Sequence, residues 1–150
     1  MTVTTLEKER FAAQSLEKPS LVRTEDGRWR LMTTAYATSD DGLEWTWHGT
    51  VLAPRPGMWD ARGARVTAVL PDGRVAYDGR ATKEENWFER IGLARLTGNG
   101  PGELEQINED AAVDARYLDV LPLSDGTCRI YYEARLPDES HELRTELIEA

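Results

Sequence analysis

The sequence predicts an all-β protein built from β-propeller blades, and three observations support this fold class. A turn followed by a strand recurs three times along the 150 residues, and each copy carries an Asp-Gly pair. The glycines of these pairs, Gly27, Gly73 and Gly126, lie 46 and then 53 residues apart, a period typical of propeller blades rather than of helical repeats. The segments on either side of each turn are short and rich in β-branched or large apolar residues, as strands are.

The strands can be placed in order around these turns. Each Asp-Gly pair is expected to close a hairpin, because glycine accepts a positive φ and aspartate tolerates it. First strands precede the turns, in PSLVRT, GARVTAVL and RYLDVLPL, and second strands follow them. Third strands are predicted in AYATSDDG, ERIGLARL and HELRTELI, and the first two units gain a fourth at EWTWHGTVLA and GELEQI. The chain therefore contains about three antiparallel units of three or four strands.

These units form one domain over residues 1–150, with approximate blades at 16–54, 59–107 and 112–150. The segment TVTTLEKERF is either a helix or the outer strand of the third unit. Most of the five tryptophans are expected to pack between blades. Because propellers typically have about four to eight blades, three units leave the ring incomplete. We expect a homodimer in which two copies complete a six-bladed ring.

Composition excludes several classes of partner. The formal charge of −9 disfavours nucleic acid, and no apolar run approaches the roughly 20 residues that cross a bilayer. The first residues lack the features of a secretory signal, so we expect a cytoplasmic protein. Cys128 is the only cysteine, and His48 and His141 have no metal-ligand spacing. We therefore expect no disulfide, no metal and no cofactor.

Two long segments carry a family resemblance. The stretch TSDDGLEWTWHGTVLAPRPGMWDARGARVTAVL, followed by GRVAYDGRATKEENWFERIGLARL, resembles the five-bladed propellers of glycoside hydrolases, in the branch of arabinanases, xylosidases, levansucrase-like enzymes and mannoside phosphorylases. The resemblance covers roughly residues 16–148 and implies a carbohydrate ligand, with catalytic carboxylates at the inner ends of first strands. Members of this family run to about twice this length, and the Asp-Pro pairs that open their inner strands do not occur in this sequence.

Glycoside hydrolysis in its usual form needs two carboxyl groups about 5 to 10 Å apart across a cleft. Asp60 is the first candidate, because it stands just before a strand and is expected at the rim of the central channel; its alternative role is structural, accepting hydrogen bonds from loop amides. The other catalytic candidates are Glu17, which precedes a first strand, Asp119, which lies within one, and Glu133, which follows two tyrosines.

The candidate substrate-binding residues are five charged side chains, which could bind sugar hydroxyls, and one tryptophan. Guanidinium groups give planar contacts with several donors, although ion pairing with neighbouring acids is the competing role in so acidic a chain. These candidates are Trp59, Arg62, Arg65, Asp78, Arg80 and Arg116. For Asp78 and Arg80 the alternative is the shaping of a turn, and for Trp59 it is core packing.

Three functions remain open on the sequence alone. The first is a glycoside hydrolase with Asp60 and one of Glu17, Asp119 or Glu133 as its carboxylate pair. The second is a catalytically silent carbohydrate-binding or assembly module, and the third is a fragment whose main property is self-association. The missing Asp-Pro pairs favour the second and third, whereas the Trp59-Asp60 and Tyr77-Asp78-Gly79 segments favour the first.

Overall fold

The computed structural model describes residues 20–24, 26–32, 34–97 and 104–149. Their strands form three separate antiparallel sheets of four, four and three strands. The first sheet contains β1 (Ser20–Arg23), β2 (Trp29–Met32), β3 (Ala35–Ser39) and β4 (Thr46–Thr50). The second contains β5 (Gly63–Val69), β6 (Val75–Arg80), β7 (Arg90–Leu96) and β8 (Leu104–Gln106). The third contains β9 (Ala115–Pro122), β10 (Thr127–Arg135) and β11 (His141–Glu149).

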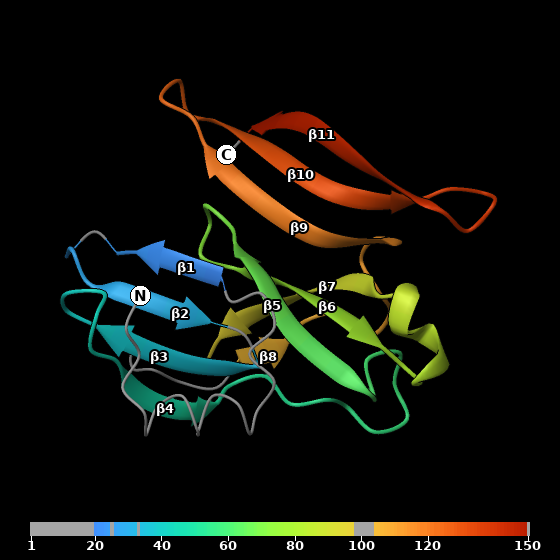
Figure 1. Cartoon of the computed structure of the whole chain (residues 1–150), viewed down its shortest axis with the longest axis horizontal. Helices are drawn as coiled ribbons and strands as arrows, with labels where there is room; N and C mark the ends of the chain where they lie inside the picture. The colour runs from blue at the N-terminus through green and yellow to red at the C-terminus, as the bar shows by residue number, and fades with distance from the viewer. Residues whose placement is uncertain (1–19, 25, 33, 98–103, 150) are drawn as a thin grey trace.

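The first strands of the sheets lie together, as the inner strands of propeller blades do. β1 contacts β5, and β5 contacts β9, whereas later strands follow outward in chain order within each sheet. Figure 1 shows β4 and β11 at opposite outer edges of the molecule, with β5 between the first and third sheets. The predicted fold class, an all-β protein of propeller blades, is therefore confirmed. The fourth strands predicted in the first two units are β4 and β8.

Helix is nearly absent from the described residues. They contain one short 3-10 helix, η1 (Glu84–Trp87), in the connection between β6 and β7. The side chain of Glu85 accepts a hydrogen bond from the backbone N–H of Ala81 at 2.7 Å, which helps to fold this loop back on itself. No helix among the described residues is long and apolar enough to cross a membrane. The segment TVTTLEKERF, predicted as a helix or an outer strand, lies outside the described residues.

The three Asp-Gly pairs of the repeats, Asp26-Gly27, Asp72-Gly73 and Asp125-Gly126, occupy hairpin turns, as predicted. Gly27, Gly73 and Gly126 have φ values of 83°, 82° and 84°. In each turn the aspartate side chain accepts a hydrogen bond from the backbone N–H two residues later. The hairpin between β10 and β11 has the same backbone hydrogen bonds, but Glu139 stands where the other turns have glycine, with φ 67°.

Replacing this glutamate with glycine is expected to stabilise the protein. A side chain at positive φ costs roughly 1 kcal/mol, which Glu139→Gly removes without disturbing the hydrogen bonds of the turn. Chemical denaturation should show a gain of up to about 1 kcal/mol in the free energy of unfolding. Gly126→Ala, the reverse change at the equivalent position, should lower the free energy of unfolding. If the two variants have the same free energy of unfolding, the prediction is wrong.

Apolar side chains fill the spaces between the sheets. Between the first and second sheets, Leu52, Val66 and Tyr77 are completely buried. Between the second and third, Ala76 and Ile91 pack with Ala115 and with partly buried side chains of β9 and β10. A further cluster on the first sheet contains three of the five tryptophans, Trp29, Trp45 and Trp47. Of the other two, Trp59 packs against the core and Trp87 is 65% exposed.

The third sheet has one face that exposes three leucines and has no covering layer among the described residues. The pairing register puts Leu121, Arg129 and Leu147 on one face, and Leu143 on that same face, opposite to the residues that contact the second sheet. Leu121, Leu143 and Leu147 are exposed, at 50%, 73% and 55%. β11 is also the edge strand of its sheet. This face is the position that a following blade would cover in a closed propeller.

Candidate functional site

The second and third sheets meet at a carboxylate held by an unusual backbone. Tyr117 has φ 57°, in the left-handed region, where β9 carries an extra residue relative to β10. Its backbone N–H donates to both oxygens of Asp78, at 3.1 and 3.2 Å. Arg65, the cross-strand neighbour of Asp78, donates to the same carboxylate at 3.0 Å. Such backbone strain is retained where surrounding contacts hold it, and it often marks functional sites.

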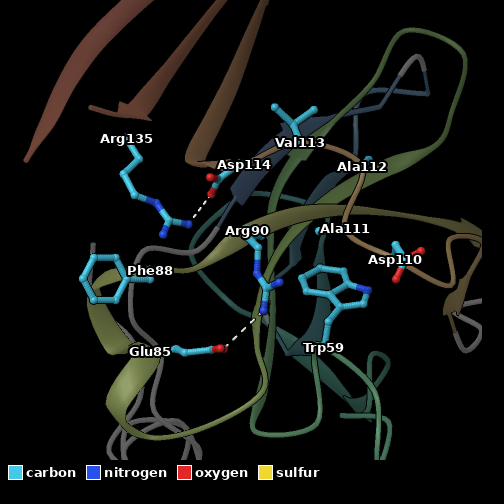
Figure 2. A pocket seen from close by; sticks show the side chains of 10 residues that line it. All are labelled: Trp59, Glu85, Phe88, Arg90, Asp110, Ala111, Ala112, Val113, Asp114 and Arg135. Atoms are coloured by element: carbon cyan, nitrogen blue, oxygen red, sulfur yellow. Dashed lines mark hydrogen bonds and ion pairs between the residues drawn. The ribbon is translucent and has the colours of Figure 1, made fainter. Parts of the chain in front are cut away.

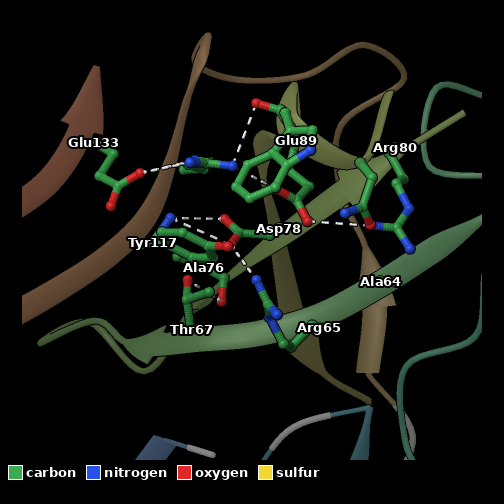
Figure 3. Close-up of polar contacts among 12 residues, drawn as sticks. Ala64, Arg65, Thr67, Ala76, Asp78, Arg80, Glu89, Tyr117 and Glu133 are labelled. Atoms are coloured by element: carbon green, nitrogen blue, oxygen red, sulfur yellow. Dashed lines mark hydrogen bonds and ion pairs between the residues drawn. The ribbon is translucent and has the colours of Figure 1, made fainter. Parts of the chain in front are cut away.

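Charged side chains of alternating sign continue from this carboxylate. The guanidinium groups of Arg65 and Arg116 lie over the ring of Tyr117, at 5.1 and 4.7 Å from its centre. Arg116 also pairs with Glu89 at 3.3 Å and with Glu133 at 2.9 Å. Arg80 completes the cluster by pairing with Glu89 at 3.2 Å. Figure 3 shows Arg65 of β5, Asp78 of β6, Glu89 of the loop before β7 and Glu133 of β10 around this cluster.

Two cavities adjoin this cluster near the inner strands. The first, which we call the axial cavity, has a volume of about 390 Å³ and is bordered by Thr34, Asp78, Arg80, Trp87 and Glu89. The second, of about 350 Å³, is bordered by residues of β1, β5 and β9, including Leu21, Thr67 and Asp119. Arg65 and Tyr117 border both cavities. The cluster therefore lies where the channel of a propeller would run.

The environment of Asp78 changes its acidity. Burial raises the pKa of Asp78 to about 6, although the Arg65 guanidinium and the Tyr117 N–H oppose this rise. The carboxyl group of Asp78 therefore titrates at mildly acidic pH, where an exposed aspartate is already fully ionised. When ionised, such a carboxyl group accepts a hydrogen bond from a sugar hydroxyl, and when protonated it can donate one. Near pH 6 it can also transfer a proton.

Asp60, the first catalytic candidate, does not lie at the rim of a channel. Its side chain is completely buried, and its carboxylate accepts hydrogen bonds from Arg55 Nε at 3.0 and 2.9 Å and from Tyr77 Oη at 2.9 Å. Burial and this bond raise the pKa of Tyr77, so the phenol remains a donor. The structure corrects the predicted position at a channel rim and supports a structural role, although the donors are the side chains of Arg55 and Tyr77 and not loop amides.

Trp59 belongs to the same packed region. Its ring stacks on Tyr77, with centres 5.6 Å apart, and it lies against the backbones of Gly79 and Gly92. A Cβ on Gly79 would come within 2.7 Å of the Trp59 ring. Core packing, the alternative stated for this tryptophan, is therefore its main role, although one side of it borders a separate outer cavity.

The remaining predicted residues divide between the cluster and the surface. Arg65, Asp78, Arg80, Arg116 and Glu133 come together in it through ion pairs, which was the alternative role stated for Arg65 and Arg116. Asp119 is exposed at the second cavity, and Arg62 is exposed beside the axial one, where its backbone N–H bonds to Arg80. Glu17 lies outside the described residues.

Three members of the site were not among the predicted site residues. Glu89 was not predicted. Gly79 pairs with Arg90 across β6 and β7, so Arg80 lies beside Glu89, and opposite charges at such cross-strand positions are a signal that could have identified it. Trp87 is exposed and borders the axial cavity, whereas most tryptophans were expected to pack between blades. Nothing in the sequence marks Tyr117, because its role depends on a bulge and a positive φ. Among the described residues, no group of three or more His, Cys, Asp or Glu side chains is placed to hold a metal ion.

Comparison with solved structures identifies the fold. A structure described under the GH130 family of mannoside phosphorylases and its glycoside hydrolases superposes with a TM-score of 0.67 and 13% identity over 93% of this chain and 50% of that one. A putative glycosidase from Bacteroides thetaiotaomicron gives a TM-score of 0.66 and 14% identity, covering 93% of this chain and 52% of that one. A third, described as a complex of BT0996 with RGII, gives a TM-score of 0.55 and 20% identity over 86% of this chain and 52% of that one.

The fold is therefore that of the propeller glycoside hydrolases, and the predicted resemblance to them is confirmed at the level of the fold. The chain spans about half the length of these solved structures. No protein-family model and no curated protein sequence matches it.

Proposed function

We propose that this chain binds a carbohydrate in the axial cavity. The observation that carries the proposal is the meeting of Arg65, Asp78, Arg80 and Glu89 at one cavity of about 390 Å³, next to the exposed ring of Trp87. Each sugar hydroxyl both donates and accepts hydrogen bonds, so a site with guanidinium and carboxylate groups side by side satisfies it. The shared fold with glycoside hydrolases supports the same ligand class.

Titration with neutral disaccharides tests this proposal. Trp87→Ala removes an exposed ring at the cavity, so it should weaken binding about tenfold, or about 1.4 kcal/mol, without unfolding the protein. Leu43→Ala, which truncates another exposed apolar side chain away from the cavity, is the matched control. Calorimetry or NMR titration measures both. Equal affinity of the Trp87 variant and the control would contradict binding at this cavity.

Hydrolysis is the second candidate function, and the raised pKa of Asp78 favours it. An acid that protonates a leaving group must hold its proton, so the rate should fall as pH rises through about 6. Glu89 and Glu133 are the carboxylates available as its partner. Assays with aryl glycosides across pH test this role, and Asp78→Asn should abolish turnover. If the protein binds glycosides but hydrolyses none of them, the second function, a catalytically silent carbohydrate-binding module, is supported and hydrolysis is not.

We further propose that two copies associate through their open sheet faces. Leu121, Leu143 and Leu147 form an apolar face where a following blade would pack, and two copies together equal the length of the solved relatives. Light scattering at micromolar concentration should give the mass of a dimer. Leu143→Glu should shift it to the monomer, whereas Leu96→Glu, an exposed site on the second sheet, should not. A monomeric mass for the unaltered chain would contradict this association.

A further inference from the structure

A third cavity lies on the other side of residues 85–90 from the axial cavity. Its volume is about 540 Å³, and it is bordered by Trp59, Glu85, Phe88 and Arg90 from the second sheet and its loops, by the connection 110–114, and by Arg135 at the end of β10. We call it the outer cavity. Figure 2 shows Arg90 and Arg135 entering it from the second and third sheets.

One short segment separates the two cavities. Along residues 85–90, Trp87 and Glu89 border the axial cavity, whereas Glu85, Phe88 and Arg90 border the outer one. Different side chains of residues 85–90 therefore border the two cavities. A substitution that changes one cavity can be compared with a substitution that changes the other.

Two arginines in the outer cavity are held in the same way. Arg90 lies over the ring of Trp59, at 5.6 Å from its centre, and pairs with Glu85 at 3.3 Å. Arg135 lies over the ring of Phe88 at 5.0 Å and pairs with Asp114. Stacking on an aromatic ring fixes the plane of each guanidinium, and the acid beside it offers acceptor oxygens.

The arginine on the third sheet also has hydrogen-bonding capacity left over. The Nε of Arg135 is buried and has no hydrogen-bond partner among the described residues. Its carboxylate partner is open to solvent, because the side chain of Asp114 is 62% exposed. A buried donor without a partner is uncommon in folded proteins, and a bound ligand is one explanation for it.

We propose that the outer cavity is a second carbohydrate site, which binds a neutral sugar through neighbouring hydroxyl groups. The pairs Arg90–Glu85 and Arg135–Asp114 each place hydrogen-bond donors beside acceptor oxygens. Two neighbouring hydroxyl groups of a sugar can bind such a pair, one by accepting from the guanidinium and the other by donating to the carboxylate. Glu85, Asp110 and Asp114 outnumber the two guanidinium groups, which disfavours an acidic sugar. The guanidinium groups over the two rings also disfavour a purely apolar ligand. This proposal does not depend on binding in the axial cavity.

NMR titration of the whole chain with cellobiose, xylobiose and mannobiose tests the outer cavity. The Nε–H signals of Arg90 and Arg135 should shift at millimolar sugar, and a galacturonic acid disaccharide should bind at least about tenfold more weakly. Arg135→Ala should weaken binding of the neutral sugar at this cavity about tenfold. Arg144→Ala, on the same sheet and paired with Glu142, is its control.

Further variants keep the test decisive. If Arg135→Ala does not fold, Asp114→Asn, at an exposed side chain, removes the charge of the acceptor and should weaken binding in the same way. Trp87→Ala should leave the shifts of Arg90 and Arg135 unchanged, which separates this site from the axial one. The proposal is overturned if no neutral disaccharide shifts these signals, if the acidic sugar binds more tightly, or if the Arg135 variant binds as well as the Arg144 control.

Discussion

Replacing Arg116 with alanine should destabilise the protein by about 3 kcal/mol and lower the melting temperature by roughly 10 °C. The expected effect is large because this buried side chain, 5% exposed, joins carboxylates of two sheets. Without it, Glu133 loses its charged partner, and Glu89 keeps only Arg80 in surroundings where it is itself 8% exposed. A buried charge left with fewer partners costs far more than the loss of an exposed ion pair. Chemical and thermal denaturation measure the difference.

A matched control is available on the second sheet. Arg95 pairs with Glu105 at 3.0 Å, but both side chains are more than half exposed. Arg95→Ala should therefore cost less than about 1 kcal/mol. If Arg116→Ala costs no more than this control, the cluster between the sheets contributes little to stability, and its geometry would have to serve ligand binding alone.

Adding one methyl group at Gly92 should be as damaging as removing Arg116. A Cβ at this position would lie 2.7 Å from Cζ2 of Trp59 and closer still to the ring of Tyr77. Neither ring has room to retreat, because the two are stacked and Tyr77 donates its hydroxyl to buried Asp60. Gly92→Ala should cost about 3 kcal/mol, at the upper end of the usual range for overpacking, and denaturant unfolding measures it.

Gly63 provides the comparison for this substitution. It also lies in a strand of the second sheet, but the nearest atoms to an added Cβ belong to the Arg80 side chain at 3.9 Å. Gly63→Ala should change stability by less than about 1 kcal/mol, because alanine also restricts the unfolded chain. Similar costs for both variants would mean that the rings over Gly92 move aside easily.

The sheets were predictable because their signals are local. An Asp-Gly pair between two apolar runs favours a hairpin through the φ of its glycine, as at Gly27, Gly73 and Gly126, whereas Asp78-Gly79 lies inside β6 and not in a turn. The spacing of the three hairpin pairs then indicates the number of sheets. Glu139 shows the limit of this signal, since a fourth hairpin adopts the same turn without the glycine that would have marked it.

The site was only partly predictable because its geometry depends on distant segments. Asp60 follows a tryptophan and precedes a strand, a position that suits a channel carboxylate and a buried one equally well. Its partners decide the matter, and one of them, Tyr77, lies on the next strand of the sheet. Asp78 was predicted to contact a ligand, but burial raises its pKa, and Tyr117, whose backbone N–H donates a hydrogen bond to it, is 39 positions away in sequence.

The placement of the tryptophans makes the molecule its own spectroscopic reporter. Trp29, Trp45 and Trp47 lie on the first sheet and Trp59 packs against the second, while the third sheet contains tyrosines but no tryptophan. Emission excited at the red edge of the absorption band therefore follows the first two sheets. Trp87 lies under the guanidinium of Arg116 and reports on the boundary between the second and third sheets. Detachment of the third sheet alone would thus appear as a small change in one indole, well before the main loss of fluorescence intensity.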